Sequence, residues 1–89
     1  ENYGGQKLDD ISEAIVIEEL SRVDPSLGVM VAVHVGLCSM TIVLNGNEEQ
    51  KKKYLPKLAS GDWIACYALT EPGAGSDALN GESTAYLND

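Results

Sequence analysis

An uncharged stretch at residues 27–44 limits the folds open to this chain more than any other feature. It contains no Asp, Glu, Lys or Arg, and as an α-helix it would be about 27 Å long, close to the length that crosses a bilayer. It also contains His34, Ser39 and Thr41, no aromatic belt flanks it, and acidic residues lie near both ends. We therefore expect a central helix of a globular protein, without membrane insertion. A helix that is apolar all round must be wrapped by other elements, and this chain offers few.

A second helix is expected before this stretch, at residues 9–23. Apolar residues recur there at helical spacing, Asp9 or Asp10 is placed as the N-cap, and Glu13 is placed for a capping box. Asp24-Pro25 should end this helix and start the central one. Aspartate caps free amides, and proline is tolerated at the first helical position.

A third helix is expected at residues 47–60. Asn45-Gly46 should end the central helix through a left-handed glycine, and Asn47 with Gln50 has a spacing close to that of a capping box. Pro56 should interrupt or kink the third helix, because proline has no N–H to donate.

After residue 61 the pattern changes to that of a sheet. Residues 63–69 are apolar, include aromatic and β-branched side chains, and are too few for a typical helix, which predicts a strand buried on both faces. Residues 83–87 could open a second strand. The predicted fold class is mainly α, with three helices (residues 1–61) leading into the first strand of a small β-domain (residues 62–89). Because a lone strand is not stable, this order suggests a cut α+β protein.

The net charge argues against nucleic acid and anionic membrane surfaces as partners. The net charge is −8, from 14 acidic and 6 basic residues, so most of the molecule repels nucleic acid and anionic membrane surfaces. Four of the six cations are Lys51, Lys52, Lys53 and Lys57. They form either a solvated helix face or a place where an anionic group docks.

The cysteines and the N-terminus give the expected compartment. Cys38 and Cys66 lie in apolar runs without metal-binding spacing, so we expect reduced core residues in a cytosol-like compartment and no metal site. The first residues have neither the basic region nor the apolar core of a signal peptide.

The loop at residues 70–77 is the candidate site. It lacks the Gly-Lys-Ser/Thr of a P-loop and the third glycine of the dinucleotide pattern. It offers the hydroxyls of Thr70 and Ser76 around a turn with exposed amides, which suit phosphates, carbonyls or the polar edge of a ring. Taken alone, these residues fit an ordinary turn as well. Glu71 suits a base or a capping group, and His34 suits a core residue or a catalyst.

The run at residues 67–78, Tyr-Ala-Leu-Thr-Glu-Pro-Gly-Ala-Gly-Ser-Asp-Ala, resembles the signature of the acyl-CoA dehydrogenase family. The resemblance continues through Glu-Glu-Leu-Ser-Arg at residues 18–22 and Gly-Asn-Glu-Glu-Gln-Lys-Lys-Lys-Tyr-Leu-Pro at residues 46–56. It implies the later part of an N-terminal helical domain, followed by the opening of the middle β-domain.

The resemblance also implies a cofactor, FAD, and the residues that contact it. Tyr67, Leu69 and Thr70 would lie against the flavin. Gly75 and Ser76 would lie by the cofactor phosphates, with Ser76 also near the CoA end of the substrate. No residue of this chain matches the family's glutamate base, so no catalytic residue is assigned.

The implied activity is α,β-dehydrogenation of acyl-CoA thioesters by the intact protein, the 89-residue chain alone being inactive. The implied partners are acyl-CoA, electron-transfer flavoprotein or a similar acceptor, and further copies of the protein in a homo-oligomer. The implied location is cytoplasmic, or the mitochondrial matrix in a eukaryote. Two alternatives stay open: an acyl-CoA oxidase or other flavoenzyme on the same scaffold, and a truncated, non-catalytic helical interaction module.

The central helix gains a second expected role from the same resemblance, because the family's counterpart lines the acyl-tail pocket. Met30, His34 and Cys38 recur four residues apart on one stripe of this helix. We hypothesise that this stripe helps to set the length of acyl chain that the protein accepts.

Overall fold

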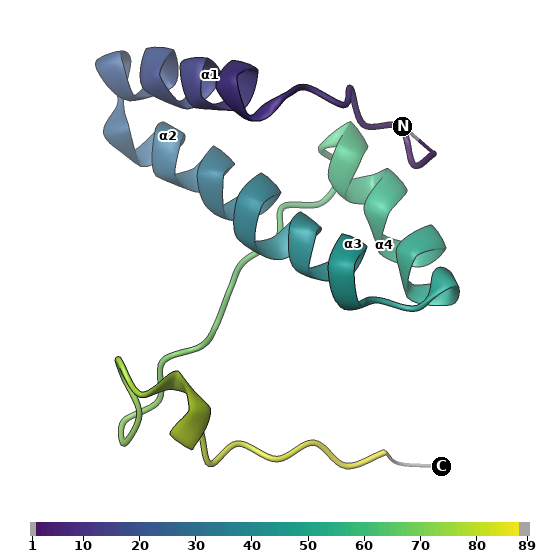
Figure 1. The fold of residues 1–89 in the computed structure, drawn as a ribbon, viewed down its shortest axis with the longest axis vertical. Helices are drawn as coiled ribbons and strands as arrows, with labels where there is room; N and C mark the ends of the chain where they lie inside the picture. Colours follow the sequence, from purple (N-terminus) through teal and green to yellow (C-terminus); the bar gives the residue numbers. More distant parts are fainter. Residues whose placement is uncertain (1, 88–89) are drawn as a thin grey trace.

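The computed structural model describes residues 2–87, and its helices form one body from which residues 62–87 extend (Figure 1). The elements in chain order are α1 (Asp10–Val23), α2 (Pro25–Ala32), a π-helical segment (Val33–Ser39), α3 (Met40–Asn45), α4 (Glu48–Ser60) and a 3₁₀ turn (Ala78–Asn80). The three predicted helical rods are therefore present.

The central rod is the continuous helical run Pro25–Asn45, made of α2, the π-helical segment and α3. It has the length and composition of a membrane span, as core helices of soluble proteins also can. α1 packs along α2, and α4 contacts α3 and the π-helical segment. The rod is thus central, as predicted, but only 11% of its most apolar stretch is buried by the described residues. The expected shortage of covering elements is confirmed.

The π-helical segment is a feature that the sequence analysis did not predict. The Met40 N–H reaches back to the Val35 carbonyl, five residues earlier, which is the π-helical pattern. Two hydroxyls also donate to carbonyls of this segment, Ser39 Oγ to His34 O at 2.8 Å and Thr41 Oγ1 to Leu37 O at 2.5 Å. Such side-chain bonds compete with the regular helical ladder and favour its local rearrangement.

Aspartates cap both N-terminal helices. Asp9 is the N-cap of α1 and accepts from the Ser12 N–H at 2.7 Å. The capping box predicted at Glu13 is therefore wrong, because Ser12 occupies the third helical position when Asp9 is the cap. Hydrogen bonding from Ser12 lowers the pKa of the Asp9 carboxyl. Asp24 caps α2 through Ser26, with Pro25 at the first helical position, as predicted.

α1 and α2 are in close contact at Gly28, which is buried. A Cβ atom at this position would lie 1.9 Å from Ser21 Oγ, 3.1 Å from Ser21 Cβ and 3.2 Å from the Ile17 carbonyl oxygen. The Ser21 hydroxyl can rotate away, but its Cβ and the Ile17 backbone cannot. Any side chain at Gly28 would therefore force the Ser21 hydroxyl to rotate and the two helices to shift apart by a few tenths of an ångström.

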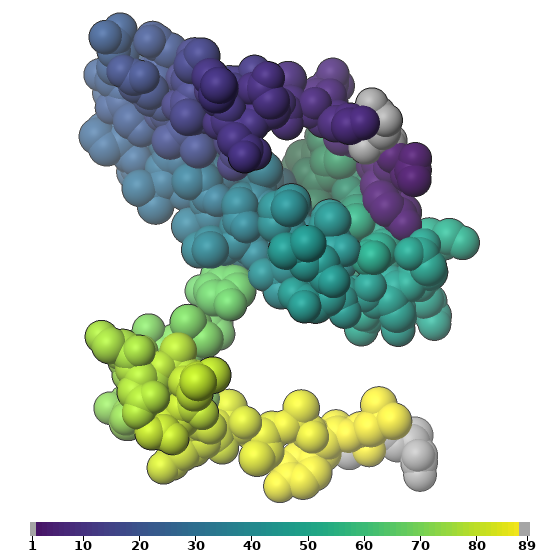
Figure 2. All heavy atoms as spheres, in the orientation of Figure 1, coloured from purple at the N-terminus to yellow at the C-terminus, as the bar shows by residue number. Residues whose placement is uncertain are grey.

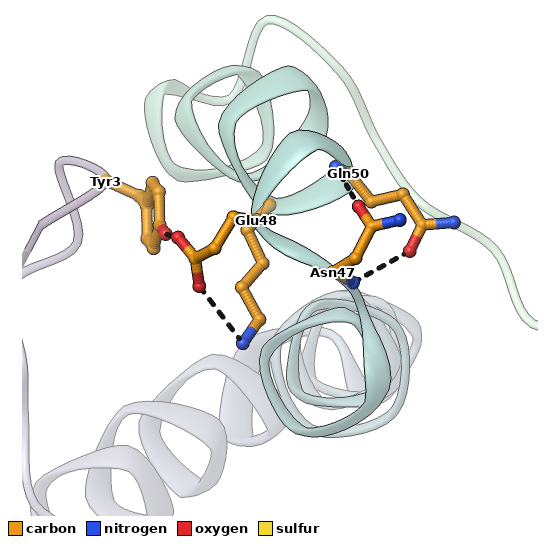
Figure 3. Close-up of polar contacts among 5 residues, drawn as sticks. Tyr3, Asn47, Glu48 and Gln50 are labelled. Atoms are coloured by element: carbon orange, nitrogen blue, oxygen red, sulfur yellow. Dashed lines mark hydrogen bonds and ion pairs between the residues drawn. The ribbon is translucent and has the colours of Figure 1, made fainter.

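The capping box at the start of α4 is confirmed (Figure 3). Asn47 Oδ1 accepts from the Gln50 N–H at 2.8 Å, and Gln50 Oε1 accepts from the Asn47 N–H at 2.9 Å. Glu48 adds two contacts, one from the Tyr3 hydroxyl at 3.0 Å and one with Lys51 Nζ at 3.8 Å. The hydrogen bond to Glu48 raises the pKa of Tyr3. This corner therefore ties the N-terminal residues to α4.

α4 runs through Pro56 to Ser60, so the predicted interruption is wrong. The helix buries Leu55 and Leu58 on either side of the proline, each less than a tenth exposed. Burying two leucines contributes about 3–6 kcal/mol, which offsets the roughly 3 kcal/mol cost of an interior proline. α4 ends at Gly61 with a φ of 79°, a left-handed conformation that glycine adopts freely.

Gly46 ends the central rod by a different route from the one predicted. Its φ is −71° and its ψ is 147°, so the left-handed conformation expected there is wrong. Glycine is still needed, because a Cβ at this position would lie 2.6 Å from the Ile42 carbonyl oxygen. The constraint is close approach to the preceding helical turn.

Residues 63–69 and 83–87 are not strands, and the described chain contains none. Residues 63–70 form an irregular segment that is hydrogen-bonded to the helices at its start and then leads away from them (Figure 1, Figure 2). A strand is stable only when paired, and residues 2–87 supply no partner for this segment. For the same reason, the prediction that Cys66 is a core residue is wrong. Cys66 is exposed, whereas Cys38 is buried as expected, and both thiols are free.

Gly28→Ala should lower the stability of the protein by about 1–3 kcal/mol, because the added methyl group pushes α1 away from α2. Thermal unfolding followed by circular dichroism measures the effect. The matched control is Gly36→Ala, also within the central rod, where a Cβ would meet only Glu13 Oε1 at 3.9 Å. Equal melting temperatures for the two variants would contradict the close contact at Gly28.

Candidate functional site

The candidate site is the loop that follows the irregular segment. Glu71 and Ala74 pair with each other through their backbones, N to O, at 3.0 and 3.1 Å. Pro72 and Gly73 form the corner of this turn, and Ala74 is only 4% exposed. A second turn follows, in which the Asn80 N–H donates to the Asp77 carbonyl at 3.1 Å. The loop is therefore built from two hydrogen-bonded turns.

The side chain of Glu71 closes this loop. Its Oε2 accepts from the Glu82 N–H at 2.7 Å, and its Oε1 accepts from the Ser83 N–H at 3.1 Å. Hydrogen bonds from the Ser83 side chain, and then from these two amides, lower the pKa of the Glu71 carboxyl. Of the two roles considered for Glu71, the geometry matches the capping role. We call this pair of contacts the Glu71 clip.

The structure leaves all five predicted ligand-binding residues accessible. Tyr67 and Leu69 are about half exposed, and Thr70, Gly75 and Ser76 are also exposed. Neither the Thr70 nor the Ser76 hydroxyl is hydrogen-bonded within residues 2–87. A Cβ at Gly75 would meet no heavy atom within 4 Å. Gly75 and Ser76 lie inside the loop closed by the Glu71 clip, whereas the other three lie before it.

The backbone of residues 66–70 offers further polar groups. Within the described chain, its N–H and C=O groups form no hydrogen bonds. A row of free amides and carbonyls beside exposed apolar side chains can pair with a neighbouring strand or with the polar edge of a flat ring. These apolar side chains and free backbone groups are chemically suited to a flat ring with a polar edge, such as a flavin.

Positive charge is absent from this part of the sequence. No Lys or Arg follows Lys57, whereas Asp62, Glu71, Asp77 and Glu82 are acidic. Amides and hydroxyls of the loop would bind a phosphate there. The positive charge that balances it would have to come from residues outside 58–87. No group of three or more metal-ligating side chains occurs among the described residues.

His34 connects the helical body to the segment that leads to the loop. Its Nε2 lies 3.1 Å from the Leu58 carbonyl oxygen, and its Nδ1 lies 3.1 Å from the Ala65 nitrogen. The partners assign a neutral imidazole with hydrogen on Nε2, since a carbonyl accepts and an amide N–H donates. His34 is thus half-buried and hydrogen-bonded at both ring nitrogens, which matches the structural one of the two roles considered for it. Its partners were not predictable, because they lie 24 and 31 residues away.

The expected stripe on the central rod is divided by the structure. Met30 and His34 line a cavity of about 240 Å³ together with Val31, Gly61, Trp63 and Ile64. Cys38 does not line this cavity and is only 6% exposed. The π-helical segment (Val33–Ser39) begins between Met30 and Cys38. Because a π-helix has more residues per turn than an α-helix, residues four apart no longer lie on one face, and the predicted stripe assumed that they do.

The lysine cluster on α4 lies beside aromatic rings. Lys53 Nζ is 5.2 Å from the centre of the Tyr54 ring, and Lys57 Nζ is 5.2 Å from that of Trp63. The two rings are 6.3 Å apart. Each lysine is within cation–π range, and Trp63 thereby packs the start of the irregular segment against α4.

Known proteins resemble this chain over most or all of its length. A family model described as the acyl-CoA dehydrogenase N-terminal domain matches residues 1–62. The chain is 57% identical, over all 89 residues, to a probable acyl-CoA dehydrogenase of Bacillus subtilis (strain 168), of which it covers 15%. It is 49% identical over 78 residues, 88% of its length, to the mitochondrial isovaleryl-CoA dehydrogenase of Bos taurus, of which it covers 18%. It is 46% identical over 85 residues, 96% of its length, to the short-chain specific acyl-CoA dehydrogenase of Clostridium acetobutylicum, of which it covers 22%. The chain thus spans less than a quarter of each of these relatives.

Glu71→Gln should open the loop. The carboxylate accepts one hydrogen bond on each of its two oxygens, whereas glutamine has only one oxygen and must lose one of these bonds. Hydrogen exchange at the Glu82 and Ser83 amides should become faster, as measured by mass spectrometry at neutral pH. Acid should act in the same direction: a lowered pKa means that the clip is present at neutral pH and is lost as the pH falls through that value. Glu82→Gln, which changes a neighbouring carboxylate outside the clip, is the control. Unchanged exchange in Glu71→Gln would contradict the clip.

Proposed function

The chain belongs to the acyl-CoA dehydrogenase family, and we propose that the full-length protein is an FAD-dependent enzyme that dehydrogenates acyl-CoA thioesters between their α and β carbons. The observation that supports this most directly is the stretch 67–76. Before the loop, this stretch has exposed apolar side chains, backbone groups without hydrogen bonds and the free hydroxyl of Thr70. Inside the loop that Glu71 closes, it has the free hydroxyl of Ser76. When bound, FAD supplies the acceptor for the hydride that leaves the β carbon.

In this proposal, the chain binds and orients the reactants. Tyr67 and Leu69 would lie against the flavin with their apolar side chains, and the Thr70 hydroxyl and amide would bind its polar groups. Gly75 leaves room for close approach to the cofactor phosphates. The Ser76 hydroxyl binds there and at the CoA end of the substrate. No residue of this chain is proposed as the base that takes the α-proton.

The proposed domain division is supported by the family model, which matches residues 1–62. Residues 1–61 form part of the N-terminal helical domain, and residues 62–89 begin the middle β-domain, with residues 88–89 outside the described part. In the full-length protein, the free backbone groups of residues 66–70 would also pair with neighbouring strands. The helices and the loop would then form two sides of one site.

The proposed partners and location follow from the family. The full-length protein would bind acyl-CoA, pass electrons to electron-transfer flavoprotein or a similar acceptor, and form a homo-oligomer. Its location would be the cytoplasm, or the mitochondrial matrix in a eukaryote. Relatives whose names include the word mitochondrial, and others from bacteria, support this range.

The decisive experiment is to purify the full-length protein and add acyl-CoA without oxygen. We expect a yellow protein whose flavin absorbance bleaches on addition of substrate. A colourless protein that does not bind FAD would overturn the proposal. Rapid reoxidation of the bleached flavin by oxygen would indicate an oxidase on the same scaffold.

Thr70→Val should weaken flavin binding or slow flavin reduction by about fivefold, because valine has the shape of threonine without its hydroxyl, and one hydrogen bond contributes roughly 1 kcal/mol. FAD titration and stopped-flow reduction by acyl-CoA measure the two effects. Thr70→Ser keeps the hydroxyl and should retain most of the function. Equal losses in the two variants would show that the hydroxyl is not the important group.

Met30→Trp should shift activity toward shorter acyl chains, because a larger side chain reduces the 240 Å³ cavity that Met30 lines. The measurement is kcat/KM across a series of acyl-CoA lengths. The control is Met40→Trp, which changes the same residue type on the same rod outside this cavity. Cys38 is unsuitable for such a test, because a tryptophan at this buried position would disrupt packing. An unchanged length profile in Met30→Trp would remove this cavity from the proposal.

A further inference from the structure

The irregular segment meets the helical body at only a few points before it reaches the loop. The Trp63 N–H donates to the Lys57 carbonyl at 3.1 Å, and the Ala65 N–H donates to His34 Nδ1 at 3.1 Å. Beyond Ala65, residues 66–70 form no hydrogen bonds within the described chain. His34 is therefore the last hydrogen-bonding partner of the backbone before Thr70.

The His34 ring is itself held by a second contact. Its Nε2–H donates to the Leu58 carbonyl, near the end of α4, at 3.1 Å. Both ring nitrogens are hydrogen-bonded, so one side chain links the central rod to α4 and to the irregular segment. A ring held in this way can transmit the position of the helices to the backbone at Ala65.

We propose that His34 is a positioning residue, whose Nδ1 acceptor fixes the backbone at Ala65 and so determines where Thr70 lies relative to the helical body. The structural part of this proposal rests on the two contacts of the ring. The consequence for the cofactor rests on the proposed function, because only there does Thr70 contact a flavin.

The two nitrogens of the ring can be separated by substitution. Asparagine places an acceptor near the position of Nδ1 and lacks the reach of Nε2, so His34→Asn should retain the bond from Ala65 and lose the bond to Leu58. Glutamine places a donor near the position of Nε2, so His34→Gln should retain the bond to Leu58 and lose the bond from Ala65. Each variant loses one hydrogen bond and removes the ring from the wall of the 240 Å³ cavity.

The first measurement needs no cofactor: hydrogen exchange of residues 65–70 in full-length protein, alongside thermal unfolding of each variant. We expect exchange at the Ala65 amide to rise about fivefold in His34→Gln and to change little in His34→Asn, which is the effect of losing one net hydrogen bond. Both variants should melt at lower temperature by similar amounts. If His34→Gln does not fold, Ala65→Pro removes the same bond from the other side and should slow flavin reduction by a similar factor in the FAD-loaded protein.

The second measurement uses the FAD-loaded protein. His34→Gln should slow flavin reduction by about threefold or more, and alter the visible circular dichroism of the flavin, with KM for acyl-CoA within about twofold of the unsubstituted protein. His34→Asn should leave the rate and the spectrum close to those of the unsubstituted protein. A purely structural role for the ring, or a role only in the cavity wall, predicts equal effects in both variants.

Equal exchange at residues 65–70 in the two variants would overturn the proposal. Exchange that rises only in His34→Gln, in a protein that does not bind FAD, would support the positioning of the backbone and reject the proposed function. Exchange and flavin effects confined to His34→Gln would support both.

Discussion

The uncharged rod Pro25–Asn45 must be covered by other apolar surface, and this need places the other helices. α1 packs on it closely enough that a side chain at Gly28 would force the two helices apart, and α4 contacts it and buries Leu55 and Leu58. The apolar side chains on the rest of the rod remain accessible, Val29, Met30, Leu37 and Leu44 among them. Within the described residues, no other element covers this surface.

Helix ends were the part of the fold most open to prediction, because caps depend on residues within one turn. Asp24-Pro25 and the pair Asn47 and Gln50 act as expected. Two helix-end predictions still failed, the capping box at Glu13 and the left-handed conformation at Gly46. The other errors arose where distant or competing interactions decide. Pro56 lies within α4 because neighbouring leucines are buried, and residues 63–69 are not a strand because pairing needs a partner outside the described chain. The π-helical segment was not predicted. The hydroxyls of Ser39 and Thr41, which bond to its carbonyl groups, favour this wider turn.

The turn at the candidate site was predictable from the sequence, but the contacts that build it were not. The glycines, the proline and the hydroxyls between Thr70 and Ser76 mark a turn that suits a ligand, and this turn is present. The Glu71 clip joins residues 11 and 12 positions apart, and the His34 contacts span still more, so periodicity could not reveal them. Glu71 and His34 attracted attention because of their chemistry, but their partners became visible only in three dimensions.

The Glu71 clip also has a thermodynamic consequence. A loop with two glycines and no regular structure has many conformations when free, and a ligand that selects one of them must compensate for the lost freedom. The clip and the two turns have already removed much of this freedom by linking Glu71 to Ala74, Glu82 and Ser83 and linking Asp77 to Asn80. Gly75 and Ser76 therefore lie on a preorganised surface, and a molecule that binds there meets a small entropic penalty.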